Sequence, residues 1–294
     1  MRYIFEPGFF ASGPVHTALL VGTIIAITSA VVGVFTVTRG QSFAGHSLAD
    51  ISITGGSGAF LIGVNQFWGY LAFGAGAAAF MEMIGVQRRR GRDVATGVVL
   101  GGALGLAALF LYLGTQNSAT TGASFTILFG SLFVLTSSTV PTLIASALIA
   151  LATVIVLAPV LLLSSLSPDI AAARGVNVRL IGAAFLMALS ISVALAAVSI
   201  GAVLSTALLV GPAATAQKVA RGPVLAMITA AVIGVVATWL GVLLSWDSFY
   251  WRPQGKSWPV SFFIVALVVG AYLVTFLKPE RPVQPAREHS CSPA

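Results

Sequence analysis

The chain has 294 residues, of which 57% are hydrophobic and only 8% are charged, and its mean hydropathy is +1.00. Soluble domains carry about 25% charged residues, so this composition excludes a protein with a water-exposed surface on all sides. The excess of 15 Lys and Arg over 8 Asp and Glu does not indicate nucleic-acid binding, because the basic residues lie between the hydrophobic runs and not along one face.

Apolar runs of roughly 20 residues, enough to cross a bilayer core of about 30 Å, recur along the whole chain. We therefore predict an all-α, polytopic integral membrane protein of the cell membrane with eight or nine transmembrane helices. Residues 1–280 are expected to form one transmembrane domain, and 281–294 a disordered cytoplasmic tail. The first run lacks a small-residue cleavage site after it and is interpreted as a span, not a signal peptide. The candidate spans are 15–38, 46–63, 67–86, 94–114, 139–163, 180–198, 200–217, 223–246 and 258–277.

The basic residues predict the orientation, because cytoplasmic loops carry an excess of Lys and Arg. An outside N-terminus and an inside C-terminus leave only Arg2, Arg252 and Lys256 outside. The residues then placed inside are Arg39, Arg88, Arg89, Arg90, Arg92, Arg174, Arg179, Lys218, Arg221, Lys278, Arg281 and Arg287.

Two regions depart from the apolar pattern. Residues 40–58 are rich in Gly, Ser and Thr although they lie between two apolar spans. Residues 115–138 are too polar for a lipid-facing helix, and we expect an external loop or a re-entrant piece packed on protein, since bare backbone is not tolerated in lipid.

His46 and Asp50 are the strongest candidates for chemistry. Charged residues at membrane depth cost about 2.5–3.5 kcal/mol on insertion scales and usually face a cavity. In a helix, residues four apart share a face, about 6 Å apart at Cβ. An imidazole nitrogen and a carboxylate oxygen so placed can bind one divalent cation, Zn²⁺ or Mn²⁺. The alternatives are a buried pair without a metal, or a loop at the interface.

Other titratable residues have plainer interpretations beside a functional one. Glu82 either lines a transport path or reaches the cytoplasmic interface and pairs with an arginine. His16 lies at the outer mouth of the first span. His289 and Cys291 lie in the Pro- and Ser-rich tail, and a single cysteine excludes a disulfide framework or a thiolate metal cage.

A short helix is predicted between two spans at residues 167–175. Ser167 is an N-cap candidate, Pro168 suits the first helical position and Asp169 favours the positive end of the helix. Arg174 is expected in the last turn, with Gly175 as C-cap. Such a helix is either a connector or an element that receives force from a cytoplasmic partner.

Four motifs, in order, resemble the permease subunits of the zinc, manganese and iron importers known as the ABC-3 family. The stretch 45–55, GHSLADISITG, matches a family motif resembling Gly-Asp-Ala-Leu-Ser-His-Ala-Val-Leu-Pro-Gly, with the Asp and His exchanged and Thr54 in place of the Pro. The other three matching stretches are 88–97, 168–176 and 201–216, the last including Pro-Ala-Ala-Thr-Ala at 212–216.

The resemblance implies an ABC importer permease fold in a homodimer, with two cytoplasmic ATPase subunits and an extracytoplasmic metal-binding protein as partners. No phosphate loop of the G-x-x-x-x-G-K-[ST] type is present, which agrees with ATP hydrolysis in a partner and not in this chain. We expect no permanently bound cofactor. The resemblance to the ABC-3 family also implies residues that couple this chain to the ATPase, which are Pro168, Asp169, Ile170, Ala173, Arg174 and Gly175. The candidates for lining the path are Glu82, Ser205, Pro212 and Thr215.

The transported ion is expected to be zinc, with manganese or iron as alternatives. One His and one Asp per subunit would give two nitrogen and two oxygen ligands across a dimer axis, which Zn²⁺ accepts readily and Mn²⁺ tolerates. The rival functions are a siderophore or cobalamin permease, a stand-alone secondary cation transporter and a membrane-embedded enzyme. The transporter class often carries an internal repeat, which we do not find, and no catalytic constellation can be assembled.

Overall fold

The computed structural model describes residues 8–84, 92–117, 122–130, 132–135, 138–202, 204–251 and 257–277. In this part of the chain the regular structure is helical, and each of the nine predicted spans overlaps a helix. The span expected at 200–217 differs most, because α8 continues to Ile200 and the 15-residue helix α9 begins only at Ser205. The helices are α1 (Gly13–Thr38), α2 (Ser42–Leu61), α3 (Gln66–Ile84), α4 (Arg92–Asn117), α5 (Gly122–Phe129), α6 (Val140–Leu166), α7 (Pro168–Ala173), α8 (Val178–Ile200), α9 (Ser205–Val219), α10 (Pro223–Ser248) and α11 (Val260–Phe276), with 3₁₀ turns η1 (Phe9–Ala11) and η2 (Leu132–Val134).

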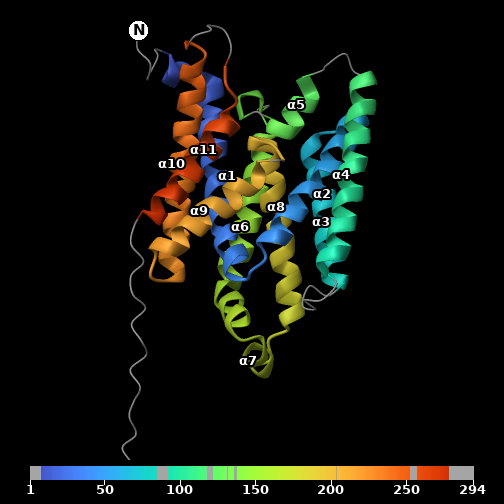
Figure 1. The fold of residues 1–294 in the computed structure, drawn as a ribbon, viewed down its shortest axis with the longest axis vertical. Helices are drawn as coiled ribbons and strands as arrows, with labels where there is room; N and C mark the ends of the chain where they lie inside the picture. Colours follow the sequence, from blue (N-terminus) through green and yellow to red (C-terminus); the bar gives the residue numbers. More distant parts are fainter. Residues whose placement is uncertain are drawn as a thin grey trace, which may run out of the picture.

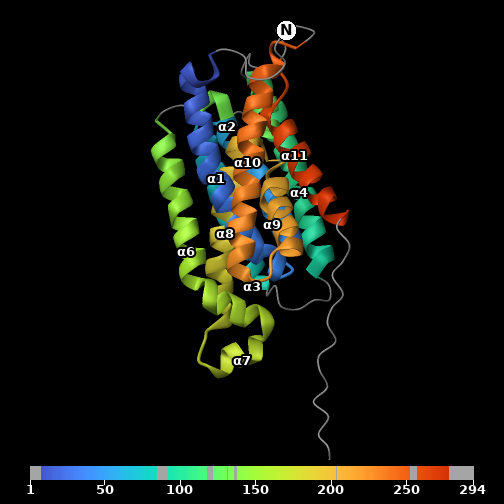
Figure 2. The same cartoon turned by 90° about the vertical axis from the view of Figure 1, so that its left-hand side faces the viewer.

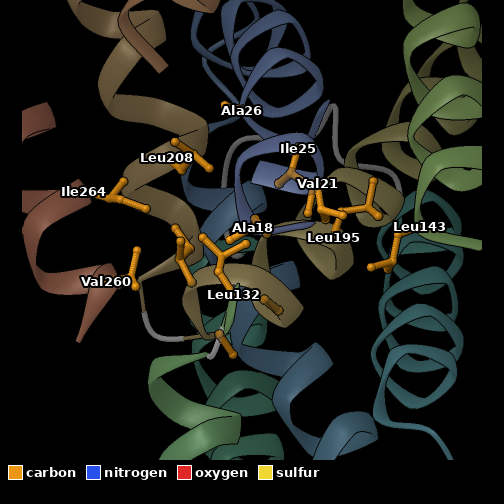
Figure 3. Close-up of a cluster of buried hydrophobic side chains, with 14 of the residues drawn as sticks. Ala18, Val21, Ile25, Ala26, Leu132, Leu143, Leu195, Leu208, Val260 and Ile264 are labelled. Carbon is orange, nitrogen blue, oxygen red and sulfur yellow. The ribbon is translucent and has the colours of Figure 1, made fainter. Parts of the chain in front are cut away.

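Helices α1 and α8 are the most buried of the long apolar helices and form the centre of the bundle. On one side α1 packs against α9 and α10, with α11 behind them (Figure 1). On the other side α8 packs against α3, and α2 packs against both α3 and α4. Helix α6 lies along α1 and α8 (Figure 2). Figure 3 shows the apolar cluster that joins these elements. Its labelled members include Val21 of α1, Leu143 of α6, Leu195 of α8, Leu208 of α9 and Ile264 of α11.

The outer helices expose large apolar side chains. Val98 of α4, Val156 of α6 and Val224 of α10 are all exposed in the isolated chain. Exposed apolar surface of this extent is unfavourable in water but suits a bilayer. Five helices (α1, α4, α6, α8 and α10) are long and apolar enough to span a membrane. The fold therefore confirms the expected polytopic membrane protein.

The polar helix α2 is compatible with this setting because its hydroxyl groups are satisfied within protein. Ser47, Ser52 and Ser57 each donate to the carbonyl oxygen four residues earlier, which is a common arrangement for Ser in helices. Thr54 donates to the carbonyl oxygen of Ala103 on α4. The Gly- and Ser-rich stretch at 40–58 is thus mainly a buried helix.

Among its described residues, the polar region 115–138 contains the short helix α5, which packs on protein, and its re-entry into the membrane stays a prediction. Ile127 of α5 is buried, and Gly130 at the end of α5 meets Gly201 at the end of α8. Both glycines have a positive φ (71° and 88°), and a Cβ on either would collide with the other segment's backbone. This contact fixes the place where the chain leaves α8 and starts α9.

Several predicted features lie outside the described residues. They are the basic cluster Arg88–Arg90, the external residues Arg2, Arg252 and Lys256, and the tail with His289 and Cys291. The domain boundary at residue 280 falls there too and stays a prediction.

Candidate functional site

The candidate metal ligands lie near the start of α2. The chain leaves α1 through Arg39 and through Gly40, whose φ is +63°, and α2 begins at Ser42. Gly45 packs this first turn closely: a Cβ there would lie 3.0 Å from Leu209 of α9 and 3.5 Å from Thr36 of α1. The backbone that carries His46 is therefore held between two neighbouring helices.

His46 and Asp50 lie on one face of α2, as their spacing predicts. His46 Nε2 is 3.4 Å from Asp50 Oδ2. Two ligand atoms bound to one tetrahedral zinc ion at about 2.0–2.1 Å are themselves about 3.3 Å apart. The two side chains are thus already at the separation that a shared divalent cation requires.

The pair is accessible from one side. The side chain of His46 is 49% exposed, whereas that of Asp50 is 12% exposed. A metal ion could therefore approach the pair at the half-exposed imidazole and then bind the largely buried carboxylate.

One chain offers only part of a coordination shell. Among the described residues, no group of three or more His, Cys, Asp or Glu side chains could hold a metal together. Structural zinc sites use four protein ligands and catalytic ones three, so two ligands need further donors from water or from another chain.

The other candidates for the transport path lie elsewhere. Ser205, Pro212 and Thr215 are buried on α9, where the Ser205 hydroxyl donates to Ala202 O and the Thr215 hydroxyl to Gly211 O. Glu82, half-buried near the end of α3, places its carboxylate beside Gly182 of α8. His16, on α1, contacts the carbonyl oxygen of Phe10 at 2.7 Å. The lining of a path by Glu82, Ser205, Pro212 and Thr215 stays a prediction, and His16 is interpreted as an interfacial histidine.

The short helix α7 forms at the expected place, at the end of the hairpin between α6 and α8 (Figure 1). Gly175 N–H donates to Ala172 O and Val176 N–H to Ala171 O, which is a Schellman ending. Two details differ from expectation. Arg174 is the C-cap residue and not part of the last turn, and the Ser167 side chain makes no capping hydrogen bond.

Sequence reasoning missed the surroundings of Arg39, which it placed only as an inside charge. Its Nη1 donates to Ser164 Oγ of α6 at 2.9 Å, and its guanidinium lies 5.4 Å from the centre of the Phe185 ring of α8. A basic residue one position after an apolar span was the signal, but it did not reveal these partners.

A bundle of apolar helices around a buried polar helix that carries a candidate metal-ligand pair is typical of a multi-pass membrane transport protein. The chain belongs to the ABC 3 transport family, whose model matches residues 14–278.

Curated relatives agree with this assignment, and a solved structure shares the fold. The chain is 26% identical over 243 residues to the manganese transport system membrane protein MntC of Listeria innocua, covering 83% of this chain and 85% of that protein. It is 25% identical over 240 residues to the high-affinity zinc uptake system membrane protein ZnuB of Haemophilus influenzae, covering 82% and 90%. The fold matches PsaBC from Streptococcus pneumoniae in complex with Fab with a TM-score of 0.79, at 22% identity over 93% of this chain and 95% of that one.

Proposed function

We propose that this chain is the membrane-spanning subunit of an importer for a divalent transition-metal ion, Zn²⁺ or Mn²⁺. The observation that carries the proposal is the His46–Asp50 pair, with its two candidate ligand atoms 3.4 Å apart on the largely buried helix α2. An imidazole and a carboxylate suit both ions, whereas a wide organic cargo such as a siderophore has no need of such a pair. Relatives named for manganese and zinc transport support the same cargo.

A second copy of the chain would complete the coordination shell. Two His46–Asp50 pairs facing each other across a two-fold axis supply two nitrogen and two oxygen ligands. The half-exposed side chain of His46 is consistent with a ligand that awaits such a partner.

Energy would come from a separate ATPase that docks on α7, while an extracytoplasmic protein delivers the ion. Helix α7 protrudes beyond the ends of the neighbouring helices (Figures 1 and 2) and exposes Ile170 to 51%. An apolar side chain on a rigid, capped helix fits an apolar groove on a partner.

The test is metal uptake by cells that carry single and double alanine variants of the pair. His46→Ala or Asp50→Ala should reduce accumulation of radioactive zinc and manganese by more than about 100-fold, because even changes behind a metal's ligands weaken binding about 10- to 100-fold. His16→Ala, a histidine outside the pair, is the matched control and should transport normally. Normal accumulation of both metals by the double variant would refute the proposal, and the ion lost in the single variants identifies the cargo.

A further inference from the structure

Arg39 lies between the ends of α1, α3, α6 and α8, at the end of the bundle that carries α7. It follows α1 directly, donates to Ser164 near the end of α6 and lies over Phe185 in the second turn of α8. The carboxylate of Glu82, near the end of α3, attracts the guanidinium electrostatically, although these two described side chains form no salt bridge. The side chain of the residue that directly follows α1 therefore contacts α6 and α8 and attracts a group on α3.

The guanidinium points into the protein. Its Nε–H is buried and has no hydrogen-bond partner among the described residues. An arginine at a membrane boundary that only reached for water would keep its head group hydrated. Burial of a cation against an aromatic face and a hydroxyl group instead ties it to these particular partners.

Two of the partners belong to the arms of the hairpin that carries α7. Ser164 lies three residues before Ser167, the N-cap of α7, and Phe185 lies on α8, which starts just after α7. Any tilt of α7 must move the ends of α6 and α8, and both ends contact Arg39.

On its other side, Arg39 is joined to the candidate ligands by a short stretch of chain. Gln41 N–H donates to Thr36 O, and Gly45 N–H donates to Gln41 O, so the turn between α1 and α2 is closed by backbone hydrogen bonds. His46 follows in the next position, seven residues after Arg39. Such a bonded turn moves as a unit with the arginine.

We propose that Arg39 is a positioning residue that transmits movement of the α6–α7–α8 hairpin to the start of α2 and thereby to the His46–Asp50 pair. The inference rests on the proposed function, because it takes α7 as the docking helix for the ATPase. Coupling between two sites requires a structural element with two arrangements, whose equilibrium is shifted by both sites. Here the sites are the ATPase-docking helix α7 and the His46–Asp50 pair, and the element is the α6–α7–α8 hairpin that contacts Arg39.

The experiment places an environment-sensitive fluorophore on each end of this connection in the assembled, reconstituted transporter. One cysteine replaces exposed Ala172 of α7, and another, in a separate protein, replaces exposed Phe43 of α2. The native cysteine is removed by Cys291→Ser. With Arg39 intact, addition of ATP should change the fluorescence at both positions.

Arg39→Ala should leave the response at residue 172 intact and reduce the response at residue 43, together with Mn²⁺- or Zn²⁺-stimulated ATP hydrolysis, by at least about fivefold, the lower limit of typical allosteric coupling. Basal ATP hydrolysis and the amount of assembled complex should be unchanged, which a merely structural role would not predict. Arg39→Lys keeps the positive charge at this position and should recover most of the response.

Controls separate this inference from the proposed function. Arg221→Ala removes an exposed basic residue from the same end of the bundle and should behave as the unaltered protein. If Arg39→Ala does not assemble, Ser164→Ala and Phe185→Leu remove one contact each, and both should weaken the response at residue 43. An unchanged response at residue 43 in these variants, with transport intact in the parent, overturns the role of Arg39 alone. Absence of any ATP response or metal uptake in the parent overturns the proposed function as well.

Discussion

At the scale of single residues, the helix and not the order of the two ligands determines the geometry of the candidate site. His46 and Asp50 face each other because they are four residues apart in α2, with 3.4 Å between Nε2 and Oδ2. Positions 46 and 50 lie on the same face of the helix whether the histidine comes first and the aspartate second or the reverse. In the ABC-3 motif that stretch 45–55 resembles, the aspartate comes first and the histidine second.

We therefore expect the exchanged double variant His46→Asp/Asp50→His to transport metal. Each single variant, with two carboxylates or two imidazoles per chain, should lose uptake by about 10-fold or more, because ligand type affects metal choice and affinity. The double variant restores the ligand set and should recover at least half of the parent uptake rate. Uptake of radioactive zinc and manganese into vesicles measures it.

One result would contradict the prediction that the exchanged double variant transports metal. If the double variant is as inactive as the single variants, the two positions are not equivalent, and the carboxylate is needed at the less exposed position. Thermal unfolding of the purified protein excludes simple misfolding as the reason for low uptake.

At the scale of helices, close crossings at glycine determine how the bundle packs. A Cβ on Gly33 of α1 would collide with the carbonyl oxygen of Leu209 on α9, and Gly55 and Gly69 would collide in the same way where α2 crosses α3. Small residues let helix backbones approach closely in membranes. The glycines of α4 differ, because a Cβ on Gly97, Gly101, Gly102 or Gly105 meets nothing within 4 Å.

Gly33→Ala should therefore destabilise the protein, whereas Gly102→Ala should not. Forcing a methyl group against a backbone carbonyl costs about 1–3 kcal/mol, but alanine in an open helical position gains up to about 1 kcal/mol over glycine. Thermal unfolding of the two purified variants in the same detergent measures the difference. Equal unfolding temperatures would show that α1 and α9 separate easily at this crossing.

The protruding helix α7 gives a second prediction at this scale. Ile170→Asp places a charge on the exposed apolar position without removing the cap formed around Gly175, so the helix should persist while docking of the ATPase is lost. Burying an unpaired charge in an interface costs several kcal/mol, which corresponds to loss of the ATPase on co-purification. Ile170→Leu keeps the apolar contact and is the matched control. Retention of the ATPase by the Asp variant would make α7 a mere connector.

How far the sequence predicted these elements depends on the range of the interactions involved. The nine helices that overlap the predicted spans follow from hydropathy, and the shared face of His46 and Asp50 follows from a spacing of four, which are local properties. The contact between Arg39 and Ser164 joins residues 125 positions apart, and Gly130 and Gly201 also meet although they are far apart in the sequence. Such contacts depend on how helices are arranged, and no local pattern encodes that arrangement.

At the scale of the whole molecule, the two ends of the bundle differ. The connection between α9 and α10 lies toward the end that carries α7, and the described N-terminal residues lie at the opposite end (Figure 1). The aromatic residues Trp246, Tyr250 and Trp258 lie near the start of α1, where Phe9 packs edge-on against Trp246 at 6.2 Å. Tryptophan and tyrosine are enriched at membrane–water interfaces, so this end is expected to lie at one surface of the bilayer.

The asymmetry of basic residues predicts that this aromatic end faces outward. In a Cys291→Ser background, a cysteine in place of exposed Ser257 before α11 should react with a membrane-impermeant maleimide added to intact cells. A cysteine in place of exposed Gly222, between α9 and α10, should react only after permeabilisation, because it lies beside Lys218 and Arg221 on the side where positive charge is retained. The reverse pattern would place α7 outside the cell, where no ATPase could dock on it. Labelling at these two positions therefore tests the orientation and the direction of transport together.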